Sequence, residues 1–275
     1  MRDERKPAEN DLVNLSSLIP HPSSPHLSME IWAHRGASDE APENTLASIE
    51  RGWPQADGVE IDVHLSRDGA IVVLHDDNTK RVAGVDKKVA EQTLAELRQL
   101  DAGRWKQESF AGESIPTLDE VVATMPPQKR LIIEIKCGPE IIPALQRPMG
   151  DAARSGQQCC FIAFSHPTLQ AIKQAFPAVP AYWLSSFRAA QDSGAWEPTI
   201  ETLIAQAKAA EFDGLDLHYD GPLEARTVTQ IQEAGLQCYV WTVNDPVVAQ
   251  RLVAAGVDGI TTDRPAWLRL QLMEA

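Results

Sequence analysis

Short apolar runs alternate with helix-forming segments along most of the chain, and this alternation restricts the folds that it can adopt. The apolar runs predict eight buried strands, at residues 30–34, 58–63, 131–136, 160–164, 180–184, 213–217, 236–241 and 257–261. Helices are predicted at 44–53, 117–124, 139–154, 166–175, 199–210, 222–234, 246–255 and 265–273. Strands that are each followed by a helix form a parallel sheet, and eight such units close into a (β/α)8 TIM barrel. An open doubly wound sheet is the alternative, but His34-Arg35-Gly36 stands where that fold usually has a Gly-rich phosphate loop.

The connection between the second and third predicted strands is much longer than the others. Asp68-Gly69 predicts a tight turn, and residues 71–74 return as a short strand, so this connection begins with a hairpin. We interpret residues from about 76 to 115 as a small insertion on the barrel, with a short helix near 94–100.

The N-terminal segment differs in composition from the rest of the chain. Residues 1–28 are charged and rich in Pro and Ser, and we expect them to form a flexible tail that activity does not require. Residues 29–275 are then expected to form one barrel domain, a length that this fold commonly takes.

Charge and cysteine usage exclude some classes of protein. The 25 Lys and Arg residues against 39 Asp and Glu give a net charge of −14, which argues against non-specific nucleic-acid binding. No apolar run approaches the roughly 20 residues that a membrane helix needs, and the N-terminus lacks the apolar stretch of a signal peptide. The four cysteines do not have a zinc-site spacing, so we expect buried free thiols and a cytoplasmic location.

Ionisable residues stand at predicted strand ends or on one strand face, where apolar residues would be expected: His34, Arg35, Glu60, Asp62, His75, Glu134 and Lys136. Residues two apart in a strand share a face. The side chains of Glu60 and Asp62 therefore lie on the same face of one strand, and those of Glu134 and Lys136 on the same face of another. In a TIM barrel the C-terminal strand ends meet at one mouth, where active sites lie. Any one of these residues could be structural, as a packed histidine or an internal ion pair. Their joint placement favours one functional cluster.

The residue types in this cluster indicate a metal ion and a phosphate. Clustered carboxylates repel one another unless a cation lies between them, and an all-oxygen ligand set suits Mg²⁺ or Ca²⁺. Arg35 and Lys136 could contact a phosphate, and His34 and His75 have the acid–base range that phosphodiester cleavage requires. Trp241 ends the seventh strand and is a candidate for the pocket wall or for simple packing.

Several motifs, in order and spacing, carry a family resemblance: His34-Arg35-Gly36, Pro42-Glu43-Asn44-Thr45, Glu60-Ile61-Asp62-Val63, Asp68-Gly69, His75-Asp76, Glu134-Ile135-Lys136, Trp241-Thr242-Val243-Asn244 and Thr262-Asp263-Arg264-Pro265. Together they span residues 30–266 and resemble the glycerophosphodiester phosphodiesterase family. The resemblance implies a TIM barrel with a small insertion after strand two. It also implies metal-dependent hydrolysis of glycerophosphodiesters to sn-glycerol 3-phosphate and an alcohol.

The resemblance assigns roles to residues of this chain. Glu60, Asp62 and Glu134 become metal ligands, and Glu43 is a further candidate for the metal or for the glycerol hydroxyls. His34 is assigned as the base and His75 as the acid. Arg35 and Lys136 become phosphate contacts.

Two other functions remain open at this stage. The same chemistry on a lipid, as in a lysophospholipase D, would favour an exposed apolar lip, whereas residues 80–115 are rich in charge. A non-catalytic barrel that binds phosphodiesters is the other alternative, but it would need no acid–base pair. The sequence leaves open the alcohol that is released, the choice between Mg²⁺ and Ca²⁺, and the oligomeric state.

Overall fold

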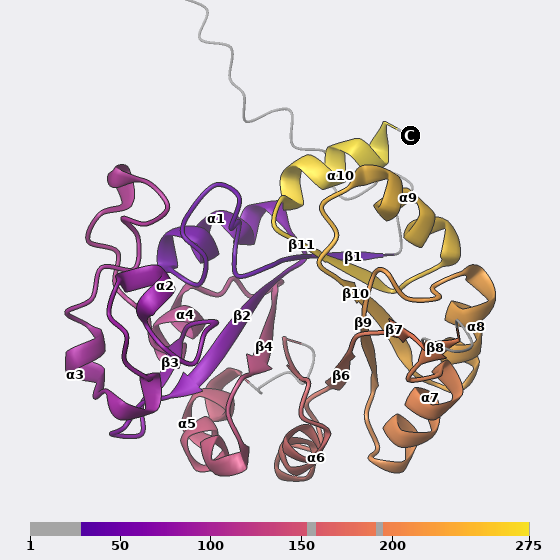
Figure 1. Ribbon diagram of the computed structural model, residues 1–275, viewed down its shortest axis with the longest axis horizontal. Helices are drawn as coiled ribbons and strands as arrows, with labels where there is room; N and C mark the ends of the chain where they lie inside the picture. Colours follow the sequence, from indigo (N-terminus) through magenta and orange to yellow (C-terminus); the bar gives the residue numbers. More distant parts are fainter. Residues whose placement is uncertain (1–28, 153–157, 191–194, 275) are drawn as a thin grey trace, which may run out of the picture.

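Eight parallel strands form a closed barrel in the computed structural model, which describes residues 29–152, 158–190 and 195–274 (Figure 1). The barrel strands are β1 (Glu30–Ala33), β2 (Gly58–Leu65), β4 (Arg130–Ile135), β5 (Cys159–Ala163), β6 (Ala181–Ser185), β9 (Gly214–His218), β10 (Gln237–Trp241) and β11 (Gly259–Thr262). Their order around the barrel is β1, β11, β10, β9, β6, β5, β4 and β2, and β1 also pairs with β2. The predicted TIM barrel is therefore confirmed. The predicted tail, residues 1–28, lies outside the described residues.

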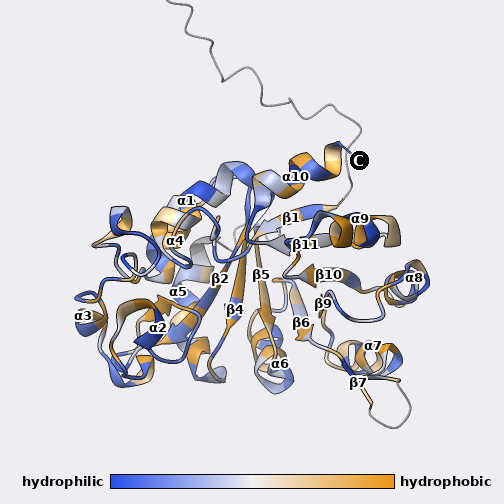
Figure 2. Cartoon of the chain, turned by 45° about the horizontal axis from the view of Figure 1, so that its top comes forward, coloured by the Kyte–Doolittle hydropathy of each residue, from blue (hydrophilic) through white to orange (hydrophobic). Residues whose placement is uncertain are grey.

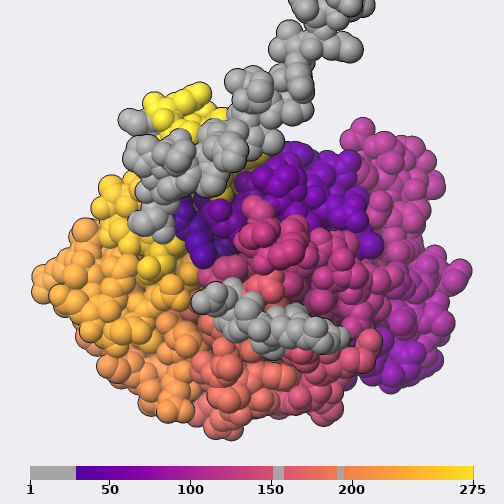
Figure 3. Space-filling model, turned by 180° about the vertical axis from the view of Figure 1, so that it is seen from behind, coloured from indigo at the N-terminus to yellow at the C-terminus, as the bar shows by residue number. Residues whose placement is uncertain are grey.

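The long helices lie outside the barrel, next to the strands that they follow. They are α1 (Leu46–Gln55), α4 (Leu118–Thr124), α5 (Ile142–Ala152), α6 (His166–Ala175), α7 (Ile200–Ala209), α8 (Ala225–Glu233), α9 (Pro246–Ala255) and α10 (Pro265–Met273). Consecutive units follow one another around the molecule, so the last lies beside the first (Figure 3). In Figure 2, β4 and β5 are largely hydrophobic, whereas the surrounding helices alternate between hydrophobic and hydrophilic residues.

Side-chain caps fix where several helices begin. Thr117 and Glu120 form a reciprocal capping box at α4, and the Asp245 carboxylate accepts hydrogen bonds from the first turn of α9. The first helix begins two residues later than predicted, because Thr45 is its cap and Asn44 has a left-handed backbone with φ 58°. The predicted helix 139–154 begins as the 3₁₀ turn η4 (Pro139–Ile141), and its last two residues lie outside the described part.

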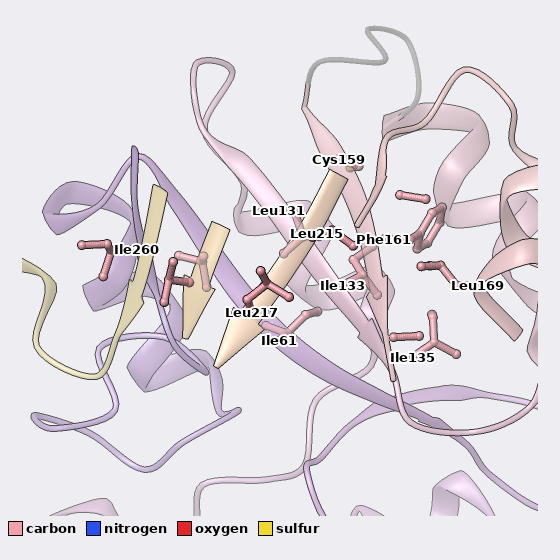
Figure 4. Close-up of a cluster of buried hydrophobic side chains, with 14 of the residues drawn as sticks. Ile61, Leu131, Ile133, Ile135, Cys159, Phe161, Leu169, Leu215, Leu217 and Ile260 are labelled. Carbon is pink, nitrogen blue, oxygen red and sulfur yellow. The ribbon is translucent and has the colours of Figure 1, made fainter. Parts of the chain in front are cut away.

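Side chains point alternately to the two faces of each barrel strand, and this divides the interior of the protein into two parts. One set of side chains, including Ile61, Ile133 and Leu215, points outward and packs against the helices (Figure 4). The other set points into the barrel. Near its N-terminal end Trp32 stacks on Tyr239 with 4.0 Å between ring centroids, and the Arg130 guanidinium lies over the Trp32 ring. These large rings fill the half of the barrel at the N-terminal strand ends, the lower half, and leave the half at the C-terminal strand ends, the upper half, for polar groups.

The long connection after β2 forms the expected insertion. Strand β2 runs two residues past its predicted end because β3 (Ile71–Val73) pairs with it antiparallel, across the turn at Gly69 (φ 83°). The short elements that follow are α2 (Lys80–Ala83), η2 (Val89–Glu91), α3 (Leu94–Leu97) and η3 (Glu108–Phe110). They surround a separate small core, which consists of Val72, Leu74, Val82, Val89, Leu97, Ala102 and Ile115.

Three further findings complete the fold. A second small sheet, β7 (Arg188–Ala189) with β8 (Trp196–Glu197), was not predicted, because two-residue strands are too short to show a hydrophobic pattern. The four cysteines are free, as predicted, but only three of them are buried, because Cys137 lies just after the end of β4 and is half-buried. Within the described residues, none of the helices is both long enough and apolar enough to cross a membrane.

The outward-facing core gives a stability prediction. Ile133 is fully buried between β4 and the helices, so Ile133→Ala should lower the free energy of unfolding by about 2–5 kcal/mol through lost packing and a residual cavity. Val247→Ala, at a residue that is 71% exposed on α9, is the control and should change it by about 0.5 kcal/mol or less. Urea denaturation measures both. Equal effects would contradict the assigned core.

Candidate active site

The predicted site residues meet at a pocket inside the C-terminal end of the barrel. Seven of them line it, namely His34, Arg35, Glu60, His75, Glu134, Lys136 and Trp241. Its volume is about 100 Å³, and Phe164 and Asp216 also contribute to its wall. Asp62 is buried beside the pocket, in register with Glu134 on the neighbouring strand. The strand alternation therefore places the residues together as the sequence predicted.

Three buried carboxylates form the centre of the site. Glu60 and Asp62 come from β2 and Glu134 from β4, and one oxygen of each lies within 4.8 Å of the others. Their exposed fractions are 2%, 0% and 9%. Charges so close in a nearly dry environment repel strongly, so they require compensation.

The pKa values of the three carboxyl groups are shifted in different directions. Burial, together with Asp62 and Glu134, raises the pKa of Glu60 well above its usual range. Burial and Asp62 also raise the pKa of Glu134 to about 7. Burial would do the same to Asp62, but Arg35 and Lys136 hold the pKa of Asp62 well below its usual range. Asp62 is thus the most acidic of the three carboxyl groups.

This donor set fits a hard divalent cation. All three groups offer oxygen atoms, which Mg²⁺ and Ca²⁺ prefer, and no described residue donates a hydrogen bond to the buried Oε1 of Glu60. A buried carboxylate oxygen without a donor is costly, and a bound cation would satisfy it. Among the described residues, the group close enough to share one ion consists of these three carboxylates.

Two cations are held against the carboxylates. Arg35 has a left-handed backbone (φ 55°), and its amide nitrogen donates to Glu60 Oε2 at 2.9 Å. The Arg35 Nε lies 3.1 Å from Asp62 Oδ2. The Lys136 Nζ lies 2.8 Å from Glu134 Oε1. Both positive groups line the pocket, where an anionic ligand would meet them.

Glu43 is bound by two arginines. Arg35 Nη1 donates to its Oε1 at 2.8 Å, and the guanidinium of Arg81, from α2 of the insertion, donates to both of its oxygens. Burial would raise the pKa of Glu43, but Arg81 and Arg35 lower it. Glu43 therefore holds Arg35 in place in this structure, and its assignment to the metal or to glycerol hydroxyls stays a prediction.

Each of the two site histidines is held by a carboxylate. The Nδ1 of His34 lies 2.6 Å from Asp263 Oδ1, and the Nδ1 of His75 lies 2.7 Å from Asp76 Oδ1. Asp263 also accepts hydrogen bonds from Ser38 and Asn244. A ring fixed at Nδ1 leaves Nε2 as the atom that can exchange a proton with a ligand.

The partners of these histidines are ionised carboxylates. Burial alone would raise the pKa of Asp263, but the hydrogen bond with His34 holds it well below its usual range. Burial lowers the pKa of His75, an effect that Asp62 partly offsets. Asp76 is in turn bound by Arg81, with 2.8 Å between Nε and Oδ2.

These supporting residues were not predicted. Asp76 and Asp263 belong to motifs that carry the family resemblance, but nothing in the sequence pairs Asp263 with His34, which lies 229 positions away. Asn44 stands at the first position of the predicted helix 44–53. It precedes the helix in the structure, where its Nδ2 donates to Asp62 Oδ2 at 2.8 Å and its Oδ1 accepts from the Asp62 amide. A conformationally unusual residue that holds a buried charge is typical of a functional site.

Comparisons with known proteins agree with this description. The glycerophosphoryl diester phosphodiesterase family model matches residues 34–267. A glycerophosphodiester phosphodiesterase of Caldanaerobacter subterraneus is 33% identical over 86% of this chain and 95% of its own length. One from Bacillus subtilis is 29% identical over 85% of this chain and 83% of its own length. The solved structure of an Oleispira antarctica phosphodiesterase, in complex with the product sn-glycerol-3-phosphate, matches with a TM-score of 0.76 and 30% sequence identity. The match covers 90% of this chain and 97% of that protein's chain.

The fold and the site define a TIM-barrel enzyme. The chain belongs to the glycerophosphoryl diester phosphodiesterase family.

The lowered pKa of Asp263 gives a prediction for stability against pH. A carboxyl group whose pKa is depressed on folding stabilises the folded state above its unfolded pKa of about 3.9, and this contribution is lost as the pH falls through the folded value. Asp263→Asn should therefore destabilise the protein at neutral pH, and the difference from wild type should shrink below about pH 4. Urea denaturation across this range measures it. A difference that stays constant with pH would contradict the assignment.

Proposed function

We propose that this protein hydrolyses glycerophosphodiesters to sn-glycerol 3-phosphate and an alcohol, and that it requires a divalent cation. The observation that carries the proposal is the pair of histidines, each fixed at Nδ1 by a carboxylate, in one pocket with three clustered carboxylates. Family membership supports the reaction class, and the product in the Oleispira antarctica structure supports a glycerol phosphate ligand.

Glu60, Asp62 and Glu134 would hold Mg²⁺ or Ca²⁺. When bound, such an ion would draw in a phosphoryl oxygen and neutralise the charge that develops on it. Arg35 and Lys136 supply further positive charge at the same pocket. Arg35 can offer two parallel donors to a phosphate, while Lys136 acts as a point charge.

The two histidines move protons in opposite directions. In our assignment, His34 takes a proton through Nε2 from the water that attacks phosphorus, while Asp263 stabilises the resulting imidazolium, and the bond from phosphorus to the alcohol oxygen breaks. His75 gives a proton to the leaving alkoxide, and Asp76 keeps its Nδ1 protonated and its ring oriented. Trp241 would form one wall for the organic part of the substrate.

We also propose a cytoplasmic location. The four free thiols, three of them buried, fit a reducing compartment.

The metal requirement is tested with a panel of substrates and metals. Glycerophosphocholine, glycerophosphoethanolamine, glycerophosphoglycerol and glycerophosphoinositol should release sn-glycerol 3-phosphate with Mg²⁺ or Ca²⁺, and chelation should stop release. Glu60→Gln should weaken metal binding measured by calorimetry at least tenfold, because a charged ligand is lost. Glu50→Gln, on the exposed surface of α1, is the matched control and should bind the metal normally.

Other outcomes of this panel would favour a different function. Faster hydrolysis of lysophosphatidylcholine than of any deacylated diester would favour a lysophospholipase D. No metal-dependent release from any of these compounds would favour a non-catalytic binding barrel.

The leaving group separates the two histidine roles. His34→Ala and His75→Ala should each lower kcat for glycerophosphocholine by roughly 10²–10⁴-fold. A p-nitrophenyl ester needs no proton on its leaving group, so His75→Ala should lose much less activity on it, while His34→Ala should lose as much as before. Circular dichroism checks that both variants are folded. The reverse pattern would exchange the two roles, and near-native rates in either variant would refute acid–base catalysis by that residue.

A further inference from the structure

Asp216 is a buried carboxyl group that the mechanism above does not use. It lies in the middle of β9, between Leu215 and Leu217, which pack outward against the helices (Figure 4). Strand alternation therefore turns Asp216 into the barrel, where it lines the pocket. Its exposed fraction is 1%, and no described residue donates a hydrogen bond to either of its oxygens.

No cation of the described part of the protein compensates this carboxyl group. Arg35 and Lys136 are paired with Glu43, Asp62 and Glu134, and burial raises the pKa of Asp216 well above its usual range, with Glu134 adding to the shift. Asp216 is also not one of the three carboxylates that lie close enough to share an ion. In either protonation state a carboxyl group keeps an oxygen that can accept a hydrogen bond.

The position of Asp216 in the barrel indicates which part of a substrate could reach it. Strand β9 stands opposite β2 in the ring of eight strands, four positions away in either direction. A phosphate held by Arg35 and Lys136 lies on the side of β1, β2 and β4, so the organic part of the substrate extends toward β9. An ionised Asp216 side chain would repel a phosphate. Its ligand is therefore better sought among uncharged hydrogen-bond donors such as a hydroxyl group.

The walls near Asp216 are mostly apolar. Leu184 on β6 and Tyr239 on β10 are its register partners, and Ile162 and Trp241 line the same pocket. A buried acceptor with apolar side chains beside it suits a short carbon chain that ends in a hydroxyl group.

We propose that Asp216 is a specificity-determining residue, whose carboxyl group accepts a hydrogen bond from the terminal hydroxyl of the substrate's glycerol group. This inference rests on the proposed function and deepens it. A substrate without that hydroxyl would leave a buried acceptor unpaired, which is the basis on which sites reject such analogues.

The test compares two substrates that differ by one hydroxyl. Both are p-nitrophenyl phosphodiesters; one carries glycerol and the other 1,2-propanediol, which lacks the terminal hydroxyl. Asp216→Leu should lower kcat/KM for the glycerol substrate roughly 10- to 100-fold and for the propanediol substrate less than about threefold. Asp216→Asn keeps an acceptor oxygen and should lose less than the leucine variant.

The control separates a specific contact from a general charge effect. Asp220→Asn removes a carboxylate whose side chain is 68% exposed, just after the same strand, and should leave the ratio of the two substrates unchanged. Removing a negative charge near an anionic substrate would by itself strengthen binding of both substrates. Equal losses on both, or gains on both, in Asp216→Leu would therefore overturn the proposal.

A binding experiment keeps this inference separate from the reaction. Measured by calorimetry, Asp216→Leu should weaken the binding of sn-glycerol 3-phosphate roughly tenfold or more, while inorganic phosphate should bind as it does to the wild-type protein. A wild-type protein that hydrolyses neither substrate would refute the proposed function, whereas unchanged sn-glycerol 3-phosphate binding in the variant would refute the role of Asp216. Asp216→Ala, which adds no bulk, serves if the leucine variant does not fold.

Discussion

The burial of three carboxylates at one end of the barrel is the constraint on which the rest of the site depends. Glu60, Asp62 and Glu134 lie almost without solvent and within a few ångströms of one another, an arrangement that is unfavourable by several kcal/mol for each unpaired charge. The first βα loop compensates part of it, through the Arg35 side chain and amide and through Asn44. Both residues adopt left-handed backbone conformations to do so. A divalent cation would compensate the remainder.

The two halves of the barrel divide stability and chemistry between them. The lower half is closed by stacked aromatic rings and by the Arg130–Glu30 ion pair, at 2.8 Å. The upper half carries the ionisable groups. The insertion stabilises the site from outside, because Arg81 on α2 binds both Glu43, which holds Arg35, and Asp76, which holds His75. The insertion therefore contributes, through Arg81, to the positions of both Arg35 and His75.

The sequence predicted the parts of this arrangement that depend on local periodicity. The alternation of β2 and β4 placed Glu60 with Asp62 and Glu134 with Lys136, and the strand count placed them at one mouth. Periodicity does not say which residues meet across the barrel, so the contact between His34 and Asp263 could not be derived from it. Asp216 is different: it alternates with Leu215 and Leu217, the same signal that singled out Glu60 and Asp62. Its position inside the barrel could therefore have been predicted from the sequence.

The claim that the three carboxylates form a metal centre is tested most directly by anomalous diffraction from crystals grown with Mn²⁺, which replaces Mg²⁺ at oxygen sites. The account predicts one strong anomalous peak within about 2.0–2.6 Å of oxygens from Glu60, Asp62 and Glu134. It also predicts that Lys136 and Arg35 remain beside the ion. A structure at saturating Mn²⁺ with no peak between these carboxylates would contradict it.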